Sequence, residues 1–60
     1  MAHKAGDRVQ VATETIQRTN GAAWRSDEGK VIGQTGDGYR VRFGDGFIAE
    51  NVKPDEITQA

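Results

Sequence analysis

Side chains that commonly act as acids, bases, nucleophiles or metal ligands are scarce in this sequence. The 60 residues contain one histidine, His3, and no cysteine, which excludes a disulfide and a thiolate metal site. The adjacent carboxylates Asp55 and Glu56 follow Pro54, but no histidine or cysteine lies near them in the sequence. Acidic residues in a turn are common, so this pair is no sign of acid–base catalysis. The sequence therefore predicts neither a catalytic residue nor a metal ligand.

The tripeptide Gly-Asp-Gly occurs twice, at residues 36–38 and 44–46, and such loops can bind calcium or phosphate. Neither copy has the oxygen ligands of a calcium loop, and neither is followed by the helix that a phosphate-binding loop requires. An Asp-Gly pair between two strand-like runs is instead a strong signal for a β-hairpin, because both residues tolerate a positive φ. We therefore expect both copies to be turns.

The residues best suited to binding are basic and lie in strand-like runs. Arg40 and Arg42 are two positions apart, so on a strand both point to the same face, and Lys30 from the neighbouring run extends them into a basic strip. Such a strip could dock onto an acidic partner or onto phosphate. The interpretation that we favour is an ordinary solvated face, whose charges pair with Glu28 or Glu50 across strands.

Two large apolar residues are further candidates for a contact surface. Trp24 is one of four aromatic residues, and we expect it to anchor a loop or an oligomer contact rather than to stack on a ligand. Ile48 is expected to face outwards, and an exposed isoleucine on a small domain often marks an interface. The predicted binding surface comprises these residues and their neighbours: Trp24, Lys30, Arg40, Arg42, Phe47, Ile48, Ala49 and Glu50.

The charge balance limits the partners. The chain contains eight lysine and arginine residues and nine aspartate and glutamate residues, which gives a net charge of −1. Because nucleic-acid affinity comes mainly from phosphate neutralisation, this balance argues against a general nucleic-acid-binding protein. No apolar run approaches the roughly 18 residues of a membrane span, and the first residues lack the apolar region of a secretion signal. We therefore expect a cytoplasmic protein without a membrane partner.

Short apolar runs separated by glycine-rich turns indicate an all-β fold. Residues 14–27 contain an Asn-Gly turn signal but only two large apolar side chains, Ile16 and Trp24. They are predicted to form a long loop over one end of the core, with a short helix over residues 22–25 as the alternative. A single 3₁₀-like turn is predicted at Pro54. Strands are predicted over residues 8–13, 28–34, 39–43, 47–50 and 56–58.

These elements predict one small domain. Their order matches a five-stranded SH3-like barrel with a long first loop over residues 6–60, behind a flexible tail of residues 1–5. Residues 47–50 alternate less clearly than the other strands, with Phe47 and Ala49 expected on one face and Ile48 and Glu50 on the other. The predicted core face of the other strands is Val9, Val11, Tyr39, Val41 and Phe43. Because a chain this short has a marginal core, oligomerisation is one route to extra stability.

Four motifs carry a resemblance to bacterial SH3-like barrels: Asp-Arg-Val at 7–9, Glu-Gly-Lys-Val at 28–31, Tyr-Arg-Val-Arg-Phe at 39–43 and Asp-Glu-Ile at 55–57. In layout the chain is similar, over most of residues 5–58, to electron-transport accessory proteins. That group includes the variable chain of ferredoxin–thioredoxin reductase, the small stromal subunit of photosystem I and the nitrile hydratase β-subunit domain. Its members are mostly non-catalytic and dock on a larger redox or metal enzyme. The resemblance implies a protein partner and no cofactor.

A second set of motifs resembles the plasmid-borne type II dihydrofolate reductases: residues 6–9, 21–24, 31–33 and 38–41. In that family four SH3-like chains form one pore that binds NADPH and dihydrofolate. This chain departs from the family at the pore motif Val-Gln-Ile-Tyr, where it has Phe47, Ile48, Ala49 and Glu50. Ile48 cannot hydrogen-bond a nicotinamide amide as glutamine does, and four copies of Glu50 would repel an anionic cofactor. The resemblance implies the fold and the tetramer more than the activity.

The sequence thus leads to three hypotheses. The first is a non-catalytic binding or accessory module that docks on a partner protein or self-associates. The alternative is a distant relative of the type II reductases, an enzyme that would use NADPH. The third is a nucleic-acid-binding barrel of the Tudor or KOW type. A peptide-binding SH3 domain of the eukaryotic kind is poorly supported, because its proline groove needs a cluster of aromatic residues.

Overall fold

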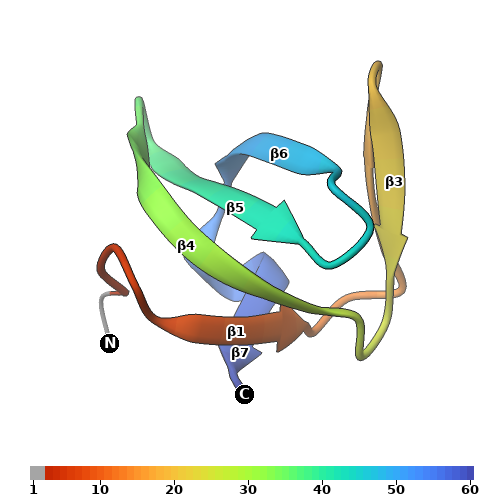
Figure 1. Ribbon diagram of the computed structural model, residues 1–60, viewed down its shortest axis with the longest axis horizontal. Coiled ribbons are helices and arrows are strands. Elements are labelled where there is room, and N and C mark those ends of the chain that lie inside the picture. Colours follow the sequence, from red (N-terminus) through yellow and green to blue (C-terminus); the bar gives the residue numbers. More distant parts are fainter. Residues whose placement is uncertain (1–2) are drawn as a thin grey trace.

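The computed structural model describes residues 3–60 as an all-β domain with two antiparallel sheets. Five strands form the main sheet in the spatial order β6-β5-β4-β1-β7, and β2 pairs with β3 in a separate hairpin. Figure 1 shows the main sheet curled, with the hairpin standing at the β6 side. The elements are β1 Arg8–Val11, β2 Thr15–Arg18, β3 Gly21–Trp24, β4 Glu28–Thr35, β5 Gly38–Phe43, β6 Ile48–Val52, η1 Pro54–Glu56 and β7 Ile57–Gln59.

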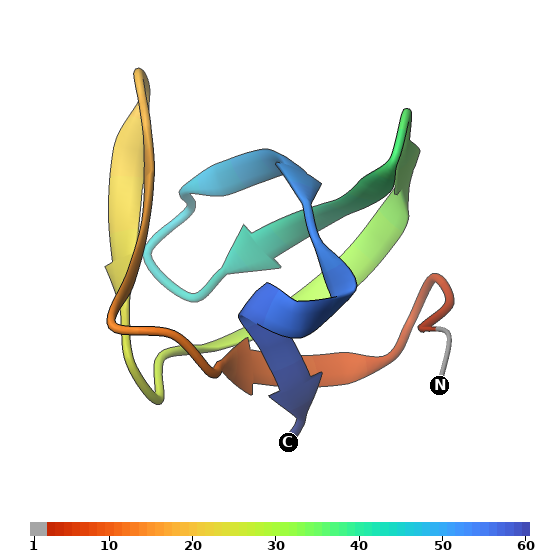
Figure 2. The same cartoon turned by 180° about the vertical axis from the view of Figure 1, so that it is seen from behind.

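The all-β prediction is confirmed, and the five predicted strands are those of the main sheet. Consecutive strands β4, β5 and β6 form the expected antiparallel meander. The chain then passes through the 3₁₀ helix η1, and β7 returns to pair with β1, as Figure 2 shows from behind. Placing β1 between β4 and β7 makes the first strand of the chain an interior strand of the sheet.

The prediction for residues 14–27 is wrong in detail, because the segment is a β-hairpin rather than a loop or a helix. Ile16 of β2 lies directly opposite Ala23 of β3, and both are 1% exposed. Facing residues of an antiparallel pair project on the same side, so this one pair buries the inner side of the hairpin. Hydrophobic burial therefore decides the local structure, although alanine favours strands only weakly.

The core consists of the inward-facing residues of both sheets. Every predicted core residue is buried, and the alternation predicted for residues 47–50 is confirmed: Phe47 and Ala49 face inwards, while Ile48 is half-buried and Glu50 is exposed. The buried set is Val9, Val11, Ile16, Ala23, Val31, Tyr39, Val41, Phe43, Phe47, Ala49, Val52 and Ile57. No polar residue in the described part of the chain is buried.

Both Gly-Asp-Gly copies are turns, as predicted, but they differ in geometry. Gly36 and Asp37 form a two-residue loop between β4 and β5. The second copy is a three-residue loop, in which the Gly46 amide donates to the Phe43 carbonyl at 2.9 Å. Gly46 has a φ of +94°, the left-handed conformation that the last residue of such a loop requires. The identical tripeptides are therefore two distinct turns.

The predicted flexible tail is described only in part, because Met1 and Ala2 lie outside the described residues. The His3 amide donates to the Tyr39 hydroxyl at 3.1 Å, and the two rings meet edge to face with centroids 5.5 Å apart. The Gly6 amide donates to the Val31 carbonyl at 2.7 Å. These contacts hold the described part of the segment against the sheet, while flexibility over residues 1–5 stays a prediction.

Candidate binding surface

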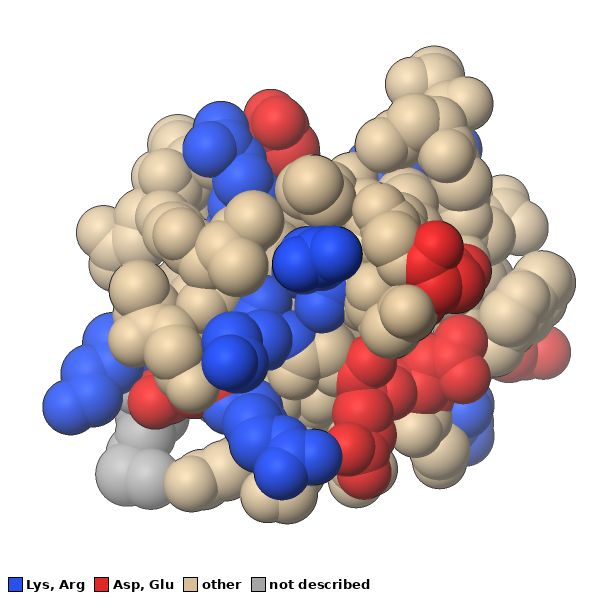
Figure 3. Space-filling model, in the orientation of Figure 1, with Lys and Arg blue, Asp and Glu red and all other residues tan. Residues whose placement is uncertain are grey.

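Three basic residues stand in one row on the outer face of the main sheet. The backbone register pairs Arg8 of β1 with Lys30 of β4, and Lys30 with Arg42 of β5. Directly paired residues of antiparallel strands project on the same side, with Cα atoms about 4.5–5.5 Å apart. All three side chains are exposed. Arg8, Lys30 and Arg42 form what we call the basic row, and Figure 3 shows lysine and arginine side chains gathered over this face.

The basic row carries charge that the protein neutralises only in part. Arg8 lies 3.2 Å from the Glu28 carboxylate, an ion pair whose side chains are mostly exposed. Within residues 3–60, Lys30 and Arg42 have no carboxylate at ion-pair distance. Like charges directly opposite one another on a sheet destabilise it, so the fold itself gains nothing from this arrangement. An anion from outside the protein would relieve the repulsion.

Apolar side chains border the basic row. Ile48 of β6 is paired with Arg42 and is half-buried. Ile32 lies where the β4–β5 register shifts, between Val31 and Gly33, and is 41% exposed. A shallow depression of about 400 Å³ is lined by Ile32 together with all three residues of the row. A ligand at this site would meet cations and apolar groups, and also the Glu28 carboxylate that pairs with Arg8.

The structure sorts the eight predicted surface residues into three groups. Lys30, Arg42 and Ile48 lie together along the row, as predicted. Arg40 and Glu50 are exposed on the same face, but the Arg40 guanidinium lies 3.5 Å from the Glu50 carboxylate. These two residues therefore form the cross-strand ion pair expected of an ordinary solvated face.

The remaining three predicted residues do not belong to this surface. Phe47 and Ala49 are 7% and 0% exposed, so naming them as surface residues was wrong. Their side chains face the core because the direction of the side chains alternates strictly from Phe47 into β6. Trp24 is 56% exposed, but it lies on the hairpin and does not line the depression at the basic row.

Two residues of the surface, Arg8 and Ile32, were not predicted from the sequence. Arg8 alternates with the buried Val9 and Val11, which is a signal for an outward side chain. Its position beside Lys30 depends on the long-range pairing of β1 with β4, which no local sequence pattern predicts. Ile32 follows the buried Val31 in a strand that alternates, but the two neighbouring apolar residues left its direction ambiguous.

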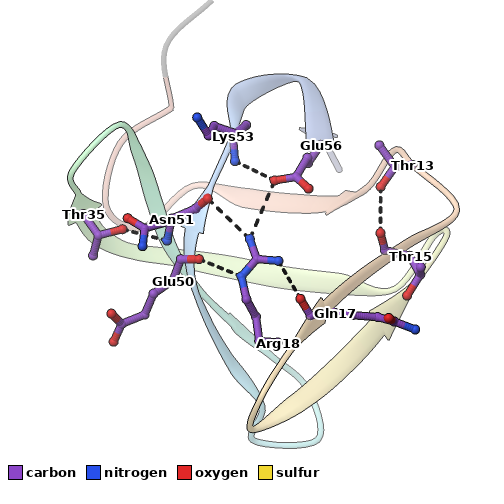
Figure 4. A network of polar contacts seen from close by, with 9 residues as sticks. All are labelled: Thr13, Thr15, Gln17, Arg18, Thr35, Glu50, Asn51, Lys53 and Glu56. Carbon is purple, nitrogen blue, oxygen red and sulfur yellow. Dashed lines mark hydrogen bonds and ion pairs between the residues drawn. The ribbon is translucent and has the colours of Figure 1, made fainter.

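A second polar cluster, centred on Arg18, is structural. Arg18 Nε donates to the Glu50 carbonyl at 2.9 Å, and Nη2 donates to the Asn51 carbonyl at 3.3 Å. The same guanidinium lies 3.8 Å from the Glu56 carboxylate, which in turn accepts the Lys53 amide at 2.8 Å (Figure 4). These contacts tie the hairpin to β6 and to η1 and satisfy carbonyls along the edge of the sheet.

Replacing Arg18 with leucine is expected to destabilise the protein by about 1–2 kcal/mol, because several charge-assisted hydrogen bonds are lost while the aliphatic stem is kept. For a small domain this lowers the melting temperature by roughly 5–10 °C. Thermal unfolding followed by circular dichroism measures the change. The control is Arg25→Leu, at an exposed position outside the cluster. Equal melting temperatures for the two variants would remove the role assigned to Arg18.

Among the described residues, no group of three or more histidine, cysteine or acidic side chains is placed to hold a metal ion. No helix in that same part of the chain is long and apolar enough to span a membrane.

No protein-family model, curated protein or solved structure matches the chain. The geometry of the basic row is therefore the main indication of function.

Proposed function

We propose that the protein is a non-catalytic binding module that docks onto an acidic segment of a partner protein through its basic row. The observation that supports this proposal is the cross-strand register of Arg8, Lys30 and Arg42. The register concentrates three cations on adjacent strands at a cost in stability, and natural proteins commonly accept such a cost at functional sites. Charge-assisted hydrogen bonds from lysine and arginine to carboxylates are among the stronger polar contacts in proteins.

The surroundings of the row favour a protein partner over a nucleic acid. Glu28 lies beyond one side of the row and Glu50 beyond the other, so a long phosphate backbone would meet carboxylates as it left the row. The neighbouring Ile32 and Ile48 offer apolar contacts that an acidic protein segment can use. The net charge of −1 points the same way.

The reductase hypothesis draws no support from β6. Where the reductases have their pore motif, strand β6 has a half-buried Ile48, a buried Ala49 and an exposed Glu50 that is paired with Arg40. Neither outward side chain can donate a hydrogen bond to a nicotinamide or a pterin, and Glu50 is negative, as NADPH is.

Binding of a short glutamate-rich peptide, measured by fluorescence anisotropy at low salt, tests the proposed function. The double variant Lys30→Gln/Arg42→Gln is expected to bind the peptide at least tenfold more weakly, because two charge-assisted contacts of about 1 kcal/mol each are lost. The matched control is Arg25→Gln, which removes an exposed cation outside the row. It is expected to bind as the unmodified protein does.

A single-stranded oligonucleotide of the same charge serves as the competing probe. Tight binding of the oligonucleotide with no binding of the peptide would replace the proposed function with nucleic-acid binding. Equal affinity of the row variant and the Arg25 control for the peptide would overturn the assignment of the site. Circular dichroism of each variant establishes that the fold is kept.

A further inference from the structure

The outer face of the sheet carries a second depression of opposite charge beside the basic row. It is lined by Asp27, Glu28 and Asp45, together with Phe43 and Gly44. Three carboxylates therefore adjoin three cations, and Glu28, Phe43 and Gly44 line both depressions. Figure 3 shows acidic side chains gathered next to the basic ones on the same face. We call Asp27, Glu28 and Asp45 the acidic cluster.

The two groups of charge follow one another along the strands. On β4, Glu28 and Lys30 are two positions apart and both are exposed, so they project from the same face. Along the next strand, Arg42 of the basic row is followed by the Gly44–Gly46 turn, which carries Asp45. The boundary between the two signs of charge thus runs across the strands and crosses β4 near Gly29.

A two-fold rotation about this boundary makes the face complementary to itself. An axis that lies in the plane of the face and runs across the strands exchanges the basic row of one copy with the acidic cluster of the other. Lys30 of each copy is then opposite Glu28 of the second copy. Such a contact is isologous, as in the two-fold dimers that are the commonest soluble oligomers.

We propose that two copies of this chain pair face to face through the basic row and the acidic cluster. The second copy supplies carboxylates to Lys30 and Arg42, which lack them within residues 3–60 of a single chain. The pairing covers the surface assigned to the acidic partner, so a partner must compete with the second copy. This inference uses the same face as the proposed function but does not depend on it, because it requires no partner.

The expected dimer is weak and depends on salt. A standard interface of roughly 800 Å² per partner takes about 20–30 residues a side and would need about a fifth of the 3914 Å² of accessible surface, whereas the basic row and the acidic cluster comprise six residues. Its main contacts are charge pairs near the surface, which are screened as the Debye length falls from about 10 Å at 0.1 M salt to about 3 Å at 1 M. Sedimentation equilibrium of the protein alone, from micromolar to millimolar concentration, is the appropriate measurement.

A charge swap on β4 tests the symmetry directly. Lys30→Glu and Glu28→Lys each place like charges opposite one another across the proposed two-fold, and each variant alone is expected to dimerise at least tenfold more weakly than the unmodified chain. An equal mixture of the two variants restores opposite charges at positions 28 and 30 and is expected to form a heterodimer. Native mass spectrometry distinguishes that heterodimer by its mass.

Asp45→Asn separates this inference from the proposed function. The turn is expected to keep its shape, since an asparagine side chain can still accept the hydrogen bond that the Phe47 amide donates to Asp45 Oδ1 at 3.0 Å. The substitution is expected to weaken the dimer while leaving glutamate-peptide binding as strong or stronger. A monomer at millimolar concentration and low salt, or a failure of the mixed variants to associate, overturns the dimer and leaves the peptide test unaffected.

Discussion

Replacing Ile16 with alanine is expected to remove about 2–5 kcal/mol of the free energy of unfolding, a large share of the total. A 60-residue domain has a free energy of unfolding of about 3–9 kcal/mol, and removing a fully buried isoleucine side chain costs about 2–5 kcal/mol. Ile16 is 1% exposed and is among the largest fully buried side chains. It is also the main apolar side chain by which the β2–β3 hairpin packs on the core.

Urea unfolding monitored by circular dichroism measures this loss, and the chain offers a matched control. Ile32→Ala removes the same atoms from a strand side chain that is 41% exposed, so its cost is expected to stay at about 1 kcal/mol or below. If both isoleucine variants unfolded at the same urea concentration, the hairpin would not be packed on the core as described.

Gly38→Ala is expected to destabilise the protein by about 1–3 kcal/mol, the usual cost of forcing extra atoms into a packed site. A Cβ atom at Gly38 would overlap the carbonyl oxygen of Val52 and lie 2.8 Å from its carbonyl carbon. Those atoms are backbone, which cannot rotate away as a flexible side chain can. Strands β5 and β6 would have to separate at the point where Tyr39 pairs with Val52.

The other Gly-Asp-Gly copy provides the control for Gly38. A Cβ atom at Gly44 would have nothing within 4 Å, so Gly44→Ala is expected to change the free energy of unfolding by less than about 0.5 kcal/mol. Thermal and urea unfolding of both variants measure the difference. Equal stability of the two variants would mean that β5 and β6 are not as closely packed at Gly38 as the structure shows.

The fold was predictable wherever local chemistry decides the structure. The two Gly-Asp-Gly turns and the alternation of Phe47 with Ile48 follow from the preferences of single residues and from the two-residue period of a strand. The β2–β3 hairpin was not predictable in this way. Its sequence has weak strand preference, and it forms because Ile16 and Ala23 pair and are buried against a core assembled by the rest of the chain.

The candidate site was predictable only in part, for the same reason. Lys30 and Arg42 belong to consecutive strands of a meander, so their proximity follows from a short hairpin. Arg8 joins them because β1 pairs with β4 across the intervening hairpin, a contact that no local pattern specifies. The acidic cluster likewise combines Asp27 and Glu28 with Asp45 from a distant turn.

The interior position of β1 also has a consequence for how the chain folds. The meander β4–β5–β6 and the β2–β3 hairpin need only contacts between neighbouring segments, whereas Val9 must find Gly29 on one side and Gln59 on the other. Closing such long loops costs entropy before the contacts are formed, which slows folding relative to proteins with local contacts. We therefore expect Val9 and Val11, both at most 2% exposed, to be fully buried only after β7 has paired with β1, so that the first of these strands in the chain is among the last to be completed.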